Sequence, residues 1–211
     1  MKGKGCVAVV LIASFLVGSV AVGAATYNNL VRLGQGVDAQ WAQVENQYQR
    51  RADLIPSLVA TVEGAAGFEK STLEEVVKAR ASVGQVNLGN VPNDPAAFAR
   101  FQQAQDGLSS ALSRLMVVVE RYPELKANQN FRDLQVALEG TENRVALERN
   151  RYNESAQAYN TARLRFPTVL FANLLGMRDK AYFKAAAGSE LPPSVKFNFG
   201  ASPAPAPAEQ R

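Results

Sequence analysis

Apolar side chains recur at alternating intervals of three and four residues along most of the chain between residues 27 and 167. This spacing places one apolar stripe on one face of an α-helix, and no window shows the strict alternation of a half-buried strand. Glycines and prolines divide the pattern into four segments, at residues 27–64, 69–86, 95–122 and 128–166. We therefore predict an all-α fold, an antiparallel four-helix bundle with long helices and short connections.

Prolines and a capping residue mark where these helices begin and bend. Asp94 is expected to cap the third helix, with Pro95 in its first position. Pro56 lies inside the first helix, so we expect a kink or a short break there. Arg50 and Asp53 are expected to face outward or to pair locally, since they are three residues apart on the helix. A further option is that Asp53, close to Pro56, satisfies backbone groups that the proline frees.

Six polar residues occupy the stripes that are expected to be buried: Arg51, Arg80, Gln105, Thr141, Glu148 and Ser155. Burying such residues costs free energy unless they find partners. With ~1.5 Å of rise per residue and an up-down-up-down order, Arg51 and Glu148 come to similar heights. We predict a buried or half-buried ion pair between these two residues. The alternative is that either long side chain reaches out to solvent.

Residues 6–25 form an uncharged, mostly apolar run that reaches the roughly 20 residues needed for a membrane-spanning helix. Small residues at Val22-Gly23-Ala24 leave a cleaved secretory signal open, although the apolar part of a signal usually has only about 7–15 residues. We favour an uncleaved anchor that contacts the lipid bilayer through residues 6–25. Lys2 and Lys4 precede the run, which favours a cytoplasmic N-terminus and an extracytoplasmic body.

The chain is thus divided into three parts: a transmembrane anchor or uncleaved signal at residues 1–26, a helical body at 27–187, and an extended Pro/Ala-rich tail at 188–211 that we expect to be disordered. Within the body, the apolar segment 168–177 is too short to span a bilayer. We favour a cap over the end of the bundle, and insertion into the bilayer interface is the alternative. Tyr182-Phe183 is assigned to the same patch.

Composition excludes several classes of chemistry. The 211 residues contain no histidine and one cysteine, so Ser-His-Asp, Cys-His and His-metal sites are excluded, as are an intrachain disulfide and a thiolate cluster. The 23 basic residues nearly balance the 19 acidic ones, and this argues against a nucleic-acid partner. We predict no catalytic residue, cofactor, metal or small-molecule substrate.

Two Tyr-Asn pairs lie one heptad apart, Tyr152-Asn153 and Tyr159-Asn160. On a helix this spacing puts both pairs on the same face. We expect the tyrosines to join the core with their hydroxyls at its rim. The asparagines are expected to hydrogen-bond across a helix interface and fix its register.

Several separated motifs resemble the LemA family, in order, along almost the whole body. The residues that carry the resemblance are Arg50, Arg51, Asp53, Pro56, Arg80, Tyr122, Pro123, Asn143, Tyr152, Asn153, Tyr159, Asn160, Phe166 and Pro167. The resemblance implies a bacterial, membrane-associated helical bundle and supplies no catalytic residues. The chain has Phe68-Glu69 where the family often has His-Glu, so no role of that histidine is available here.

We expect a membrane-anchored protein without catalytic activity, in the bacterial cytoplasmic membrane, that binds other envelope proteins or forms a homo-oligomer through its coiled-coil-like stripes. One alternative is a secreted or periplasmic helical protein after signal cleavage. Another is a membrane-remodelling or stress-linked factor, which the family resemblance favours. A di-metal carboxylate enzyme is disfavoured, because it needs several inward glutamates and only Glu148 lies squarely on a stripe.

Overall fold

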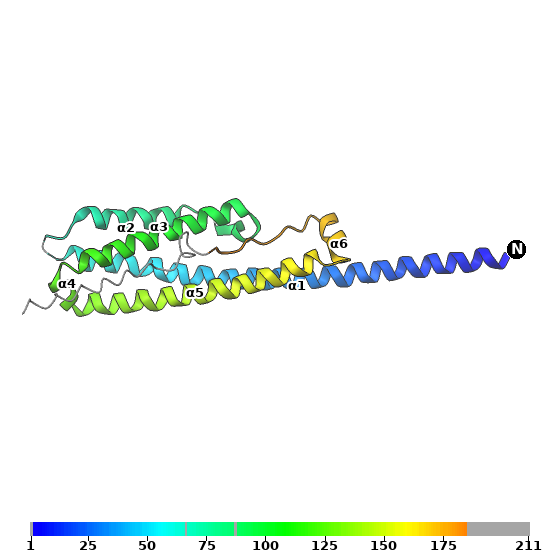
Figure 1. Cartoon of the computed structure of the whole chain (residues 1–211), viewed down its shortest axis with the longest axis horizontal. Coiled ribbons are helices and arrows are strands. Elements are labelled where there is room, and N and C mark those ends of the chain that lie inside the picture. The colour runs from blue at the N-terminus through cyan, green and yellow to red at the C-terminus, as the bar shows by residue number, and fades with distance from the viewer. Residues whose placement is uncertain (1, 66, 87, 185–211) are drawn as a thin grey trace, which may run out of the picture.

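The computed structural model describes residues 2–65, 67–86 and 88–184, and every regular element in these ranges is helical. The elements are α1 (Lys2–Glu63), α2 (Lys70–Gly84), the short 3-10 helix η1 (Leu88–Asn93), α3 (Pro95–Val119), α4 (Pro123–Ala127), α5 (Gln129–Leu164) and α6 (Thr168–Leu174). Figure 1 shows an elongated molecule in which α1 and α5 run side by side along the long axis, and α2 and α3 lie over one end of that pair. The all-α class is confirmed, with one long apolar helix at the N-terminus.

Helices α1 and α5 form the longest packed pair and run antiparallel. Arg51 of α1 pairs with Glu142 of α5. Seventeen residues earlier in α1, Gly34 lies against Tyr159, seventeen residues later in α5. A constant sum of residue numbers along two helices is the signature of an antiparallel register. This register determines which polar residues of the two stripes can meet.

Helices α2 and α3 form the second antiparallel pair. Ion pairs join Glu75 to Arg114 and Glu69 to Arg121, with nitrogen–oxygen distances of 3.5 and 3.1 Å. Asp94 caps α3 as predicted, because its carboxylate accepts a hydrogen bond from the backbone N–H of Ala96 at 2.9 Å. A capping side chain of this kind satisfies one of the donors that a helix leaves free at its start.

The buried side chains form two clusters along the body. The aromatic cluster lies toward α6 and contains Trp41, Tyr48, Phe98, Phe101, Tyr152 and Phe183. The distal cluster lies toward α4 and is mainly aliphatic, with Ile55, Leu58, Val62, Leu73, Leu108, Leu115 and Leu138 among its members. Arg51 is placed between the two clusters, because its neighbours in the α1 stripe are Tyr48 and Ile55. The core is therefore interrupted by a polar layer.

Of the predicted kink or short break at Pro56, the break is wrong, because α1 is one helix from Lys2 to Glu63; the kink stays a prediction. Proline has no N–H, so the carbonyl of Ala52 loses its helical donor. Arg80 of α2 supplies a donor instead, with its Nε 3.1 Å from the Ala52 oxygen. Arg50 and Asp53 both face outward, as predicted. Asp53 accepts a hydrogen bond from Gln49, so the further option that it fills the role at the proline is wrong.

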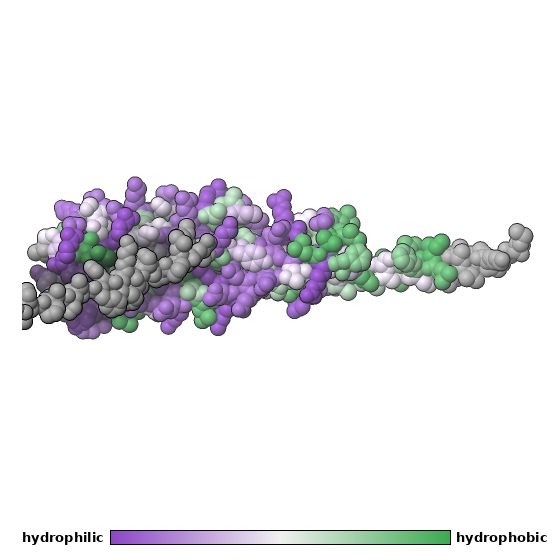
Figure 2. Space-filling model, in the orientation of Figure 1, coloured by the Kyte–Doolittle hydropathy of each residue, from purple (hydrophilic) through white to green (hydrophobic). Residues whose placement is uncertain are grey.

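The part of α1 before Leu30 stands clear of most of the body. The large apolar side chains between Leu11 and Val22 are exposed, Phe15 to 75%, and Figure 2 shows hydrophobic surface on the coloured part of this helix. Among the described residues, α1 is the one helix whose length and composition would let it cross a membrane, and a signal sequence near the N-terminus would satisfy the same criteria. The predicted tail at 188–211 lies outside the described residues, and the boundaries of the three parts stay predictions.

Candidate functional site

The polar layer of the core is built around Arg51, whose side chain is 1% exposed. Its Nη1 donates to Glu142 Oε1 at 2.6 Å and to Ser109 Oγ at 2.9 Å, and its Nη2 donates to the side-chain oxygen of Gln105. The guanidinium also lies over the ring of Tyr48, 5.0 Å from the centroid. One side chain of α1 is thus bonded to both α3 and α5.

The arrangement of this layer explains how a charge can be buried here. An unpaired charge in a core is strongly destabilising, whereas a guanidinium offers a planar fork of donors that several acceptors can satisfy together. Glu142 supplies the opposite charge while it keeps 44% of its side chain exposed, so only one of the two ions is fully desolvated. The geometry indicates a structural role, the fixing of register between three helices.

The predicted ion pair between Arg51 and Glu148 is wrong, although Arg51 is buried and paired. Glu148 instead pairs with Arg151 of its own helix at 2.8 Å. The register of α1 against α5 places Glu142 opposite Arg51, and Glu148 lies six residues further along α5, ~9 Å away along the axis. The estimate from helix lengths alone therefore placed Glu148 almost two helical turns too close to the level of Arg51.

The aromatic cluster is closed by a residue from outside the long helices, Phe183. Its ring packs against the rings of Trp41, Phe98 and Tyr152, at centroid distances of 6.1, 4.7 and 5.4 Å. Arg149 of α5 lies over the Phe183 ring at 5.0 Å. Phe183 is therefore a core residue, and its assignment to the apolar patch of segment 168–177 is wrong.

Two asparagines of α5 hold the segment that carries Phe183. Asn153 donates to the backbone oxygen of Phe183 at 3.1 Å and accepts from its backbone nitrogen at 2.9 Å. Asn160 makes the same pair of bonds to Lys180, both at 2.9 Å. A carboxamide carries one acceptor and two donors, so it can bond to a peptide unit as a neighbouring strand would. We call this arrangement the asparagine clamp.

The spacing of the clamp follows from the geometry of its two partners. Seven residues of α-helix between Asn153 and Asn160 rise ~10.5 Å. Three residues of extended chain between Lys180 and Phe183 span ~10 Å. The heptad repeat therefore matches a three-residue step of the clamped segment. The predicted role of the asparagines as helix–helix contacts is wrong, since both hold this extended segment.

Lys180 anchors the same segment through its side chain. Although it is 7% exposed, its ammonium group lies 3.0 Å from Asp38 Oδ1 of α1 and 2.6 Å from Asn93 Oδ1 of η1. It also lies 5.7 Å from the centre of the Tyr159 ring. A buried ammonium with an opposite charge and two further partners is satisfied, so this lysine serves as a tie between α1, η1 and the segment.

The buried tyrosines remain in their neutral form. Burial raises the pKa of Tyr152 above its usual range, and its hydroxyl has no hydrogen-bond partner among the described residues. Burial also raises the pKa of Tyr48, against the lowering effect of Arg149, whose Nε donates to the Tyr48 hydroxyl at 2.5 Å. The pKa of Tyr159 is raised mainly by burial. None of these shifts activates a phenol as a base, which would need a lowered pKa.

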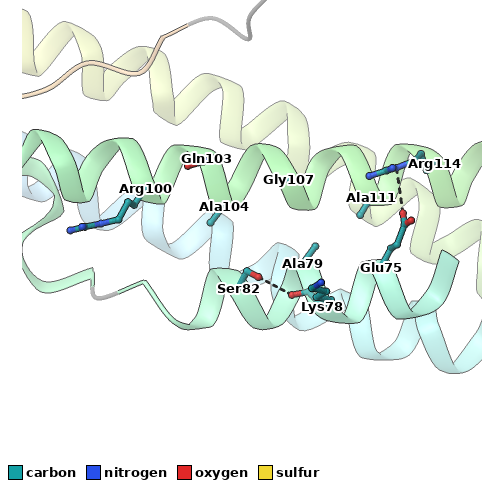
Figure 3. A pocket seen from close by; sticks show the side chains of 10 residues that line it. All are labelled: Glu75, Lys78, Ala79, Ser82, Arg100, Gln103, Ala104, Gly107, Ala111 and Arg114. Atoms are coloured by element: carbon teal, nitrogen blue, oxygen red, sulfur yellow. Dashed lines mark hydrogen bonds and ion pairs between the residues drawn. The ribbon is translucent and has the colours of Figure 1, made fainter. Parts of the chain in front are cut away.

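A groove of about 490 Å³ separates parts of α2 and α3 and is drawn in Figure 3. Small residues form its floor, including Ala79, Ala104 and Gly107. Its polar contacts are the ion pair of Glu75 with Arg114, across the groove, and a hydrogen bond from Ser82 to its own helix. No polar groups converge on a common point as they do in a binding site. The described residues contain no group of three or more potential metal ligands among His, Cys, Asp and Glu.

The remaining motif residues have structural positions or lie at the surface. Tyr122 packs against Phe68 at a centroid distance of 4.9 Å and donates its hydroxyl to the backbone oxygen of Gly67 at 3.0 Å. Pro123 begins α4, and Pro167 immediately precedes α6. Three further motif residues are exposed: Arg50, Asn143 and Phe166.

In the residues that the structure describes, the fold is all-helical, with one long apolar helix at its N-terminus. A family model described as LemA family matches residues 40–197. The chain therefore belongs to the LemA family, and the resemblance seen in the sequence is confirmed.

Curated relatives include three magnetosome proteins. Magnetosome protein MamQ 2 and Magnetosome protein MamQ 1 of Paramagnetospirillum magneticum are each 25% identical to this chain over 209 residues, which cover 90% of this chain and 77% of theirs. Magnetosome protein MamQ of Magnetospirillum gryphiswaldense is 26% identical over 183 residues, which cover 79% of this chain and 67% of its own. Family membership and the exposed apolar helix are consistent with a membrane-associated helical protein.

Proposed function

We propose that this chain is a non-catalytic, single-pass membrane protein whose body binds other envelope proteins or a second copy of itself. In this proposal α1, α2, α3 and α5 act together as an antiparallel four-helix bundle. Residues 6–25 anchor it in the bacterial cytoplasmic membrane, with the N-terminus in the cytoplasm and the bundle outside.

The observation that carries the proposal is the continuity of α1. The same helix is apolar and exposed between Leu11 and Val22, and it packs into the body from Leu30 onward. A signal that is removed by cleavage does not need to be continuous with a helix of the mature fold, whereas the apolar run here continues into the buried part of α1. An anchor that continues into the core instead fixes the orientation of the body relative to the bilayer, because no linker separates the anchor from the body.

Among the described residues no ionisable group is prepared for a reaction, and this supports a role in binding. The buried ionic groups Arg51 and Lys180 are bonded to partners within the fold. The tyrosine pKa values are raised, which is opposite to what a phenolate nucleophile needs. The relatives are named for a cellular body, the magnetosome, and not for a reaction, which supports the same proposal.

Membrane attachment is tested by extraction of the full chain from bacterial membranes with alkaline carbonate. We expect the wild-type protein to stay in the pellet. Leu16→Lys places a charge in the middle of the apolar run, where insertion costs about 3 kcal/mol more, and we expect a larger share of it in the supernatant. Val117→Lys, at an exposed position of α3, is the matched control. Complete extraction of the wild-type chain would contradict the anchor.

Partner binding is tested with photo-crosslinking residues on the exposed surface of the body. Positions Val77, Val117 and Val136 are exposed and sample three different helices. We expect at least one of them to give a defined adduct in intact cells, either with a second copy or with another envelope protein. A body that gives no adduct from any of the three faces would count against the interaction role.

A further inference from the structure

A group of large apolar side chains is exposed around α6, at the end of the body nearest the N-terminal helix. Its members are Leu164, Phe166, Leu170, Leu174 and Leu175, and we call it the α6 patch. Phe166 and Leu174 are the most exposed, at 82 and 83%. Figure 2 shows hydrophobic surface gathered at this end of the body, where Figure 1 places α6. Such a patch on a polar body marks an interaction surface.

The other face of α6 is packed, which fixes where the patch lies. Ala172 is fully buried, and a Cβ built on Gly23 would lie 3.2 Å from Cε1 of Phe171. Helix α6 therefore lies directly beside α1 at Gly23. That residue belongs to the apolar run 6–25, and it is the third from the end of that run.

The position of Gly23 sets the depth of α6 when α1 spans a bilayer. A run of 20 residues rises ~30 Å, the thickness of the hydrocarbon core. Gly23 then lies ~3 Å inside the edge of that core. Amphipathic segments at an interface bury their apolar face about 5–10 Å into the boundary between headgroups and acyl chains. Helix α6 lies beside Gly23 and is therefore next to this boundary.

The charges next to the patch suit the headgroup layer. Arg165 and Arg178 are exposed and flank α6 in the sequence. Arg32 is exposed on α1, nine residues beyond Gly23 toward the body, or ~13 Å along the axis. Basic side chains near the surface of a membrane are attracted to lipid phosphates and to anionic lipids. Apolar residues at the core edge and arginines beyond it form the usual order of an interfacial segment.

The fold also removes the main obstacle to insertion of so short a helix. A seven-residue peptide does not form a stable helix in water. Here α6 is held by α1 and α5, and the chain reverses after it at Gly176, whose φ of +67° favours glycine. The following segment is held by the asparagine clamp. The helix is therefore ordered before it meets lipid.

We propose that the α6 patch inserts into the interfacial layer of the bilayer that α1 crosses, as a second membrane contact of this protein. The proposal rests on the membrane anchor proposed above. With two contacts, α1 and α6, the body is held against rotation about α1 and presents a fixed face along the membrane surface. A cap over the end of the bundle explains the buried face of α6 and leaves the exposed apolar side chains of the α6 patch without a partner.

The test uses full-length protein in vesicles of phosphatidylcholine and phosphatidylglycerol that carry bromine on their acyl chains. Bromine quenches tryptophan only on contact, and the native Trp41 is buried in the aromatic cluster. Tryptophan is introduced singly as Leu174→Trp in the patch, as Phe15→Trp in the anchor, and as Val117→Trp on the exposed distal surface. We expect bromine near the headgroup end to quench about half or more of the added Leu174→Trp signal, as at interfacial depth, and to leave the Val117→Trp signal unchanged.

The three variants separate failure of this inference from failure of the anchor. Phe15 is near the middle of the run 6–25, so bromine near the ends of the acyl chains is the probe for Phe15→Trp. Quenching of Phe15→Trp by that bromine, without quenching of Leu174→Trp by bromine near the headgroups, would overturn the interfacial contact while the anchor stands. Absence of quenching in both would overturn the anchor and with it this proposal. A second copy covering the patch would appear as an unquenched Leu174→Trp together with a disulfide-linked dimer of Leu174→Cys in a Cys6→Ala background, and this outcome too would overturn the lipid contact.

Discussion

The two halves of the core are assembled by different means. The distal cluster is built mainly from helices, with Phe68 added from the connection between α1 and α2. The aromatic cluster needs Phe183, which arrives on a segment after α6 that is held by two asparagines. Helix periodicity thus describes most of the distal cluster and leaves out a central residue of the aromatic cluster. The polar layer around Arg51 separates them.

The difference has a consequence for the end of the body beside the apolar part of α1. The clamped segment that completes the aromatic cluster follows α6 in the chain, so the packing of Phe183 and the position of α6 are linked. A change that releases the segment should loosen this end of the body and leave the distal cluster intact. The predictions below test this separation, and stability in each case is the free energy of unfolding of the full chain in detergent.

The largest effect is expected for Phe183→Ala. Truncation of a buried phenylalanine typically costs about 3–5 kcal/mol through lost burial and the cavity left behind. We expect a cost in this range although Phe183 lies outside every helix, and Phe131→Ala in the distal cluster should cost a similar amount. Chemical denaturation followed by circular dichroism measures both. A cost for Phe183→Ala no larger than that of the exposed control Val117→Ala would contradict its place in the core.

The polar layer should show the next largest effect. Arg51→Ala leaves Gln105 and Glu142 without their donor, and loss of one partner of a buried pair costs roughly 3 kcal/mol or more. Glu142→Gln should cost less, because the amide oxygen still accepts a bond from Arg51. Glu148→Gln is the discriminating control, expected to stay within about 1 kcal/mol since its partner is an exposed arginine. Equal costs for the two glutamate variants would contradict the observed pairing.

The asparagine clamp should have a moderate and local effect. Asn160→Ala removes both hydrogen bonds to the backbone of Lys180, at a cost of about 2 kcal/mol. Hydrogen exchange should become faster at the amides of residues 180 and 183 while the amides of α2 stay protected. Asn143→Ala, an exposed asparagine of the same helix, is the control. Unchanged protection at residue 180 would show that the clamp does not hold the segment.

The smallest effect concerns Pro56 and Arg80. Arg80→Met removes the donor to the Ala52 carbonyl and should cost about 1 kcal/mol. In a Pro56→Ala background the helix supplies its own donor to that carbonyl, so the cost of Arg80→Met should nearly vanish. A double-mutant cycle measures this coupling directly. Additive costs would indicate that Arg80 acts independently of the proline.

Much of this fold could be predicted from the sequence, because helices can be recognised from the local periodicity of their apolar residues. The cap at Asp94, the burial of Arg51 and the apolar start of the chain follow from short-range rules of this kind. The partner of Arg51 could not be predicted in the same way, since it depends on the register between α1 and α5. Glu142 and Glu148 differ by ~9 Å along the axis, which an inference from helix lengths does not resolve.

The clamped segment was missed for a different physical reason. Its backbone bonds are made to side-chain amides, so it has neither the period of a helix nor the alternation of a strand. The signal was present in the repeat of Asn153 and Asn160, which was assigned to a helix–helix contact because both asparagines lie on a helix. Two asparagines that are seven residues apart on a helix can therefore also indicate an extended segment, whose backbone they bind at two residues three positions apart.

The most direct test of the central claim is the intact mass of the chain recovered from carbonate-washed membranes of cells that make it at native levels. The claim is that α1 joins the anchor to the body as one retained helix. The account predicts a chain that still contains residues 6–25 in the membrane pellet. A chain shortened by about the first 24 residues, as signal cleavage would leave it, and recovered in the soluble fraction would contradict it.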